Sequence, residues 1–294
     1  MHENGVGGRV GAHCLAADTP ALLADGSTRP IGALRPGDRV FGTRDGRYSP
    51  TVVVARSTAA RPAYRVSLAG GTQVVSGAGN RLRTDLGWRA LTPGGERLHL
   101  TRGTRVQGTG RFAAPPERNR DYRLGYLWGA VRGGPPVAPE VLARVREFAG
   151  GGEPRERDLV EWPTQLGDDW AKGFLAGVFD VRGAAVGGQV VLSSPDSAVF
   201  EAVVVALLRL RVPHSVEVRG VRVTGAPAER LRFLHLVGPV LARPAVLEGV
   251  QVGGAPALGV VSVESLGIEV EMGAVTTESG DLVVNGLIAC ADGR

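Results

Sequence analysis

The sequence predicts a mostly β domain that is interrupted by an α/β domain. Glycine is abundant, at 44 of 294 residues, and aromatic residues make up only 5%, which favours many short strands and turns over long helices. Short apolar runs separated by turn residues fill the chain up to about residue 93 and return after about residue 256. Longer segments with helical periodicity lie between them. We therefore expect the two β segments to meet in space as one domain.

The expected elements follow from these patterns in order. Strands are predicted at residues 39–42, 51–55, 64–68 and 72–76, with Gly70 and Gly71 forming a hairpin turn. Helices are predicted at residues 119–131, 168–181, 197–211 and 228–241, and strands at residues 187–193 and 215–223. The last predicted strands are residues 258–263, 268–272 and 281–284.

These elements divide the chain into five parts. Residues 1–13 are polar and glycine-rich and are interpreted as a leader. Residues 14–95 and 256–290 are the two parts of the β domain, residues 96–255 are the α/β insert, and residues 291–294 are a tail.

Composition narrows the functional class. No run of 18 apolar residues and no signal-peptide pattern is present, so we expect a soluble cytoplasmic protein without a membrane partner. Two cysteines, Cys14 and Cys290, are too few for a disulfide scaffold. The net charge of +5 is modest, and residues 94–250 carry only +4, which is weak support for DNA as a partner. No cofactor or metal site is predicted.

Cys14 opens the most informative run in the chain. It is followed by a short apolar stretch, an Asp25-Gly26 turn, a second apolar stretch and a Pro36-Gly37-Asp38 turn. The run resembles the first motif of the Hint fold, a horseshoe-like all-β fold shared by inteins and hedgehog-type autoprocessing domains. The resemblance implies that the Cys14 thiol attacks the preceding peptide bond and converts an amide into a thioester. The alternative interpretation is a buried structural cysteine.

Residues 71–88 resemble the second intein motif, aligned on Gly87 and Trp88. The threonine of that motif is Gly77 here, and the histidine is Asn80. The family's histidine protonates the nitrogen of the bond that breaks. Asn80 can donate a hydrogen bond but cannot titrate, and general acid help is typically worth roughly 10²–10⁴ in rate. Alternatively, Asn80 is a turn residue.

Residues 273–291 resemble the C-terminal intein motifs. Ala274 stands where the resemblance places a catalytic aspartate. Two alignments are open at Cys290: it replaces the penultimate histidine, with Ala291 in place of the terminal asparagine, or it is the first residue of the following segment and the acceptor for transesterification. In both, the asparagine that would cyclise is missing.

The α/β insert resembles a homing endonuclease of the LAGLIDADG type. Residues 174–183 (Phe-Leu-Ala-Gly-Val-Phe-Asp-Val-Arg-Gly) resemble the second of its two paired helices, and residues 124–135 more weakly resemble the first. Each helix should end in an acid that binds a divalent metal, but the positions hold Gly134 and Arg182. Asp180 lies two residues earlier, at a position that more often has a packing role. We expect DNA cleavage to be lost.

These resemblances predict an intein-like autoprocessing element. Cys14 would form a thioester at the 13/14 junction, with Asn80 and Cys290 as further catalytic residues, and its partners would be its own flanking host segments. Splicing and endonuclease steps are expected to be impaired. The alternatives are a noncatalytic structural or interaction insert of a host protein, a variant that splices through other residues, and an active DNA-binding homing endonuclease.

Overall fold

The computed structural model describes residues 13–93, 98–135, 138–151, 166–186, 188–218, 220–241, 246–253 and 258–291. The chain forms two compact units, one made of Met1–Arg111 with Glu248–Arg294 (unit 1) and the other of Phe112–Leu247 (unit 2). Each unit has its own core of buried apolar side chains. Among the described residues, no helix has the length and apolar character needed to cross a membrane.

Unit 1 is built almost entirely from antiparallel strands, which form one five-stranded and one six-stranded sheet with the orders β13-β1-β6-β5-β4 and β3-β2-β14-β15-β7-β8. Its elements are β1 (Cys14–Ala16), β2 (Pro20–Leu22), β3 (Thr28–Pro30), the 3-10 turn η1 (Ile31–Ala33), β4 (Arg39–Arg44), β5 (Arg47–Leu68), β6 (Gln73–Gly77), β7 (Arg81–Thr84), β8 (Gly87–Ala90), β13 (Val260–Thr277), β14 (Asp281–Val284) and β15 (Leu287–Cys290).

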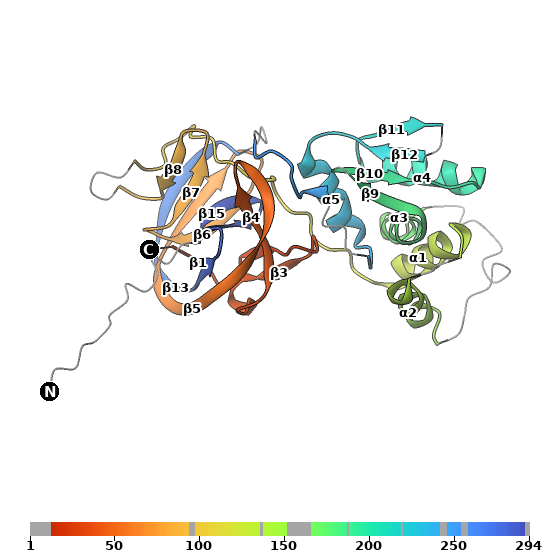
Figure 1. Cartoon of the computed structure of the whole chain (residues 1–294), viewed down its shortest axis with the longest axis horizontal. Helices are drawn as coiled ribbons and strands as arrows, with labels where there is room; N and C mark the ends of the chain where they lie inside the picture. Colours follow the sequence, from red (N-terminus) through yellow and green to blue (C-terminus); the bar gives the residue numbers. More distant parts are fainter. Residues whose placement is uncertain are drawn as a thin grey trace. The chain divides into compact units, whose positions relative to one another are not determined.

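Two long strands join the N-terminal and C-terminal parts of unit 1. β5 has 22 residues and β13 has 18, and they pair antiparallel from Val260 opposite Leu68 to Thr277 opposite Val53. They lie side by side as long curved ribbons (Figure 1). β1 lies between β13 and β6, so Cys14 is held by strands from both parts of the chain. The expectation that the two β segments meet is confirmed.

Tight turns set the register of the hairpins. Asp45 and Gly46 have φ values of 50° and 73° between β4 and β5, and Asn285 and Gly286 have 43° and 79° between β14 and β15. Two consecutive positive φ angles give a turn whose twist matches paired antiparallel strands, and Asp-Gly and Asn-Gly tolerate them best. The predicted Gly70-Gly71 turn is confirmed between β5 and β6.

In the part of unit 2 that the structure describes, five helices combine with an antiparallel sheet of order β11-β12-β10-β9. Its elements are α1 (Arg120–Arg132), α2 (Pro139–Phe148), α3 (Asp168–Arg182), β9 (Gly183–Val186), β10 (Gln189–Leu192), α4 (Ser197–Arg209), β11 (His214–Glu217), β12 (Gly220–Val223) and α5 (Pro227–Val237). Asn119 caps α1 by accepting a hydrogen bond from the backbone of Tyr122, and Asp196 caps α4 in the same way.

The helices α1 and α3 cross with their backbones in close contact. A Cβ added at Gly125 or Gly129 of α1 would overlap carbonyl oxygens of α3, and a Cβ at Gly173 or Gly177 would overlap carbonyl oxygens of α1. Each helix therefore contributes two glycines four residues apart to the crossing. Two aromatic side chains, Trp170 and Phe174, stack beside it at 4.9 Å between ring centroids.

The structure differs from the sequence expectation in the bounds of the insert and in several elements. The insert was expected at residues 96–255, but the structure divides the units at Arg111 and Leu247. The reason is that Val106 bridges to Thr84 and Gly108 bridges to Leu287, which ties residues 98–111 to the strands of unit 1. The two predicted strands at 51–55 and 64–68 are parts of the single strand β5, and α2 and β9 were not predicted.

Candidate functional site

Cys14 lies in the middle of a sheet with its thiol against a glycine. Its register partner in β13 is Ala274, so the position where the resemblance expects an aspartate faces Cys14 directly and carries a methyl group. A Cβ added at Gly77 would lie 2.5 Å from the Cys14 Sγ. The thiol therefore occupies the space that a larger residue at position 77 would fill, and Cys14 is only 5% exposed.

Burial raises the pKa of the Cys14 thiol above its ordinary value. A hydrogen bond from the Gly77 backbone and the charge of Arg61 act in the opposite direction but do not outweigh burial. The neutral thiol is thus the resting form near neutral pH. Only a small fraction of Cys14 is deprotonated near neutral pH, and a reaction through the thiolate would proceed from that fraction.

Asn80 reaches Cys14 through an intervening serine. Its Nδ2 donates to the Ser76 Oγ at 2.8 Å, and that hydroxyl donates to the carbonyl oxygen of Cys14 at 2.8 Å. The Asn80 Oδ1 accepts from the backbone N–H of Arg81 at 2.8 Å. Asn80 is fully buried, and both ends of its amide are in use. It fixes the turn between β6 and β7 and orients the Cys14 backbone.

Cys290 lies at the end of β15, where it contacts Arg81. One guanidinium nitrogen, Nη2 of Arg81, is 3.3 Å from the Cys290 Sγ and 3.1 Å from the His13 Nε2. His13 directly precedes Cys14 in the chain. Arg81 therefore contacts both Cys290 and the residue next to Cys14. Sequence analysis missed Arg81. Its only signal in the sequence was its place directly after Asn80.

A pocket of about 450 Å³ opens beside Cys290. Its lining comes from the strands β4, β7, β8, β14 and β15 and from two turns, and it includes two arginines and an indole: Thr43, Asp45, Gly46, Arg81, Arg83, Trp88, Ser279, Gly280, Asp281 and Cys290.

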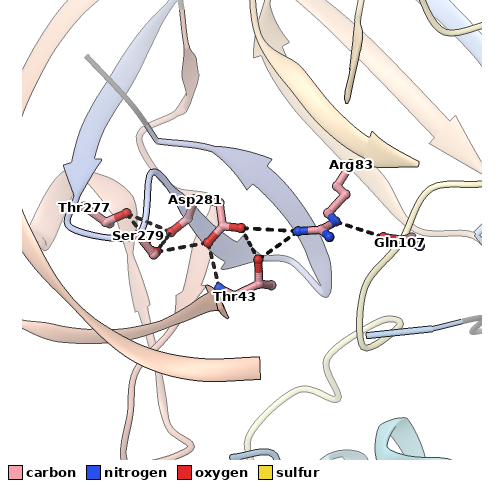
Figure 2. A network of polar contacts seen from close by, with 6 residues as sticks. All are labelled: Thr43, Arg83, Gln107, Thr277, Ser279 and Asp281. Atoms are coloured by element: carbon pink, nitrogen blue, oxygen red, sulfur yellow. Dashed lines mark hydrogen bonds and ion pairs between the residues drawn. The ribbon is translucent and has the colours of Figure 1, made fainter. Parts of the chain in front are cut away.

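Asp281 is the centre of a polar network on one side of this pocket, also missed from sequence (Figure 2). Its carboxylate accepts from the backbone N–H of Thr43 at 2.7 Å, from the Thr43 hydroxyl, and from the Ser279 Oγ at 3.0 Å. Arg83 lies 4.0 Å away and donates to Thr43 and to Gln107. Burial raises the pKa of Asp281 although the bonds from Thr43 and Ser279 oppose that effect. The network joins β4, β7 and β14.

In unit 2, the two positions where metal-binding acids were expected lie together. The Arg182 Nε donates to the carbonyl oxygen of Gly133 at 2.8 Å, and its guanidinium lies against Gly134. The positively charged guanidinium of Arg182 therefore lies at the place where two metal-binding carboxylates were expected. Among the described residues, no group of three or more histidine, cysteine or acidic side chains could hold a metal ion.

Asp180 has a packing role in unit 2. It accepts hydrogen bonds from the Tyr126 hydroxyl at 2.8 Å and from the backbone N–H groups of Val240 and Leu241 at 2.9 Å each. These three donors connect α3 to α1 and to the segment after α5. Burial raises the pKa of Asp180 despite these donors.

Comparison with known proteins gives a structural similarity only. No family model matches the chain, and no curated protein matches its sequence. Among solved structures, the chain is similar to the Ssp DnaB mini-intein variant M86, with 11% identity, 95% of this chain and 92% of that chain covered, and a TM-score of 0.41. It is similar to a DnaB intein from Synechocystis sp. PCC 6803, with 10% identity, 95% and 98% covered, and a TM-score of 0.41. Over 31% of this chain and 65% of the other, it is 31% identical to the MchDnaB-1 intein, with a TM-score of 0.26. These solved structures to which the chain is similar are inteins.

Proposed function

We propose that this chain is an intein-like autoprocessing element that retains the first chemical step and has lost later ones. The observation that carries the proposal is that the strand of Cys14, β1, is met by both other motif regions: Gly77 and, through Ser76, Asn80 from residues 71–88, and Ala274 from residues 273–291. These residues come from both parts of unit 1, which an unrelated buried cysteine would not require.

In the proposed step, the Cys14 Sγ adds to the carbonyl carbon of His13. The bond from that carbon to the Cys14 nitrogen breaks, a carbon–sulfur bond forms, and the thiol proton goes to the released amino group. The donors around Cys14 hold its backbone, since Ser76 donates to its carbonyl oxygen. The partner of the reaction is the flanking segment of the same polypeptide.

The first step lacks its general acid, and the later steps lack their chemical groups. Asn80 cannot titrate, Ala274 supplies no carboxylate opposite Cys14, and neither Cys290 nor Ala291 is an asparagine. Loss of general acid help costs roughly 10²–10⁴ in rate, so release of the leader should be slow. Complete splicing should fail because cyclisation at the C-terminal junction has no substrate.

Mass spectrometry of the purified protein tests the proposal. With dithiothreitol, wild type should lose residues 1–13 over hours to days, while Cys14→Ala should stay intact. Cys290→Ala is the matched control, because it removes the other cysteine and should still release the leader. An intact wild-type mass with dithiothreitol after several days would support the noncatalytic insert instead.

For unit 2 we propose a LAGLIDADG-type domain without metal-dependent cleavage. The glycine-lined crossing of α1 and α3 supports the domain type, and the Arg182 guanidinium against Gly134 supports the loss of cleavage. Supercoiled plasmid carrying the uninterrupted host site, incubated with the protein and Mg²⁺, should remain uncut. Site-specific nicking would show an active endonuclease and overturn this part of the proposal.

A further inference from the structure

The pocket beside Cys290 has one wall that is both basic and aromatic. Arg81 and Arg83 are two residues apart in β7, so their side chains project from the same face of the strand, and Leu82 between them is fully buried on the other face. Trp88 of β8 is the register partner of Arg83, and side chains at directly opposed positions share a face of the sheet. Both arginines and Trp88 line the pocket. The hairpin of β7 and β8 therefore presents two guanidinium groups and an indole to the same space.

Arg83 has hydrogen-bond donors that its neighbours do not use. Its Nη1 donates to the Thr43 hydroxyl at 3.0 Å, and its Nε donates to the Gln107 Oε1 at 3.1 Å. Its third nitrogen, Nη2, has no hydrogen-bond partner among the residues that the structure describes (Figure 2). The side chain is 30% exposed, so a ligand can reach it. A guanidinium is always charged, and carboxylates and phosphates are the acceptors that fit its donors best.

Two acidic residues of the pocket limit the charge that a ligand can carry. Asp281 accepts hydrogen bonds from the backbone N–H and the hydroxyl of Thr43 and from the Ser279 Oγ, so its carboxylate is already satisfied within the protein. Asp45 lies in the exposed turn between β4 and β5. Both carboxylates would repel a dianion such as phosphate, and a monoanion would be repelled less. The unused donors of Arg83 therefore suit an anion with a single negative charge.

The size of the pocket allows a ligand larger than a simple ion. Its volume of about 450 Å³ is many times the share of one water molecule, which is roughly 30 Å³ in the liquid. It also falls within the range of roughly 300–1,000 Å³ that is typical of small-molecule sites. The indole of Trp88 adds a flat apolar surface, against which a planar group packs well. These properties together fit a molecule that has one carboxylate and a planar body.

We propose that this pocket of unit 1 is a binding site for a small organic carboxylate with a planar body. The carboxylate accepts hydrogen bonds from the Arg83 Nη2, and the planar body packs against Trp88. Arg81, two residues along the same face of β7, adds a second positive charge to this wall. The site goes beyond the proposed function, because binding there requires neither the Cys14 thiol nor a thioester.

Binding of benzoate to the full chain tests the proposal. The Cys14→Ala variant is used throughout, so that autoprocessing does not alter the protein during the measurement. Isothermal titration calorimetry at constant ionic strength should show one saturable site for benzoate. Acetate, which has no planar body, and inorganic phosphate should both bind more weakly. Arg83→Gln should weaken benzoate binding about tenfold or more, because charge-assisted hydrogen bonds are lost. Trp88→Leu should reduce the preference for benzoate over acetate.

Arg89→Gln is the matched control, because Arg89 lies in the same hairpin but is not among the residues that line the pocket. It removes the same charge from the protein and should leave the affinity for benzoate unchanged. Asp45→Asn should change the affinity in the other direction. It removes a negative charge from the lining, and asparagine tolerates the φ of 50° at this position. Benzoate should then bind roughly two- to threefold more tightly.

Several results would overturn the site. The first is the absence of saturable benzoate binding to the folded Cys14→Ala protein. Equal losses in Arg83→Gln and Arg89→Gln would indicate general attraction by charge, and phosphate binding at least as tight as benzoate binding would exclude a preference for carboxylates. If Arg83→Gln does not fold, Asp45→Asn still decides, because unchanged or weaker binding contradicts an anion beside Asp45. Leader release is measured separately, so its absence contradicts the proposed function and leaves the carboxylate site unaffected.

Discussion

Cys14 and Gly77 share a space that holds only one side chain. The Sγ lies 2.5 Å from where a Cβ on Gly77 would be, and Gly77 has no strained backbone angle that would itself demand glycine. The requirement for glycine therefore comes from the thiol. At the residue scale, Gly77, one of the positions that depart from the resembled motif, provides the space in which the Cys14 thiol lies.

Gly77→Ala should displace the thiol and slow thiol-dependent release of residues 1–13 by roughly tenfold, the equivalent of about 1.4 kcal/mol. The measurement is the rate of leader loss by mass spectrometry. Gly253→Ala is the control, because a Cβ there meets no atom within 4 Å, and it should leave the rate unchanged. Equal rates for Gly77→Ala and wild type would show that the sulfur does not depend on this space.

The reactivity of Cys14 should increase with pH. Burial raises its pKa, so the thiolate fraction at neutral pH is lower than for an exposed cysteine and grows as pH rises towards the raised pKa. In Cys290→Ala protein, iodoacetamide alkylation of Cys14 should reach half its maximum above about 8.5. A midpoint below that value would mean that the Gly77 hydrogen bond and Arg61 outweigh burial.

The sequence predicted the convergence around Cys14 but not the residues that complete it. The order of the motifs is enough to bring Cys14, Asn80 and Ala274 together, because each motif belongs to a known place in the fold it resembles. Arg81 and Asp281 depend on the pairing of β7 with β15 and of β14 with β15. That register is a non-local property, and a local pattern of residues does not define it.

At the scale of elements, the crossing of α1 and α3 depends on four glycines. Gly125 and Gly129 face carbonyl groups of α3, and Gly173 and Gly177 face carbonyl groups of α1. Backbone atoms cannot rotate away as a side chain can, so the helices must separate to admit a methyl group.

Gly173→Ala should therefore destabilise unit 2 by about 3 kcal/mol, the upper part of the range for overpacking. Urea unfolding followed by the fluorescence of buried Trp128 and Trp170 measures this loss. Gly167→Ala is the matched control, since a Cβ there meets nothing within 4 Å and the cost of replacing an N-cap glycine is about 1 kcal/mol or less. Similar losses in both variants would contradict close helix packing as the cause.

The strand β5 shows why some elements were not predicted correctly. Its middle, residues 56–62, is polar and largely exposed, so it has no alternation of apolar side chains to indicate a strand. Its extended form comes from pairing with β13, whose residues lie more than 200 positions later. The helix α4 was predicted because a packed face repeats within it, with Val199, Ala202, Val203, Ala206 and Leu207 buried. The helices α1 and α3 are buried along most of their length.

For the whole molecule, the separate cores indicate that unit 1 does not need unit 2 to fold. The apolar cluster of unit 1 contains residues only from its own two parts, and residues 249–251 are held to the β4–β5 hairpin. The ends of the intervening segment are thus anchored within unit 1.

Replacing residues 112–247 by a flexible linker of about ten Gly and Ser residues, which spans roughly 17 Å on average, should leave unit 1 folded. Leader release from Cys14 should proceed at the wild-type rate, as measured by mass spectrometry. The same replacement carrying Cys14→Ala is the control and should stay intact. A folded replacement with no release, beside an active wild type, would show that unit 2 contributes to the reaction.

The pairing of β1 with β13 sets the order of events during synthesis. Ala274 and Cys290 leave the ribosome after Cys14, Gly77 and Asn80, from which they are separated by the whole of unit 2. At roughly 5–20 residues per second, the interval between Asn80 and Cys290 is on the order of tens of seconds. During that time β1 lacks its neighbour and the Cys290 thiol does not yet exist in the site. The surroundings of Cys14 that the structure shows are therefore complete only after β13 has been synthesised.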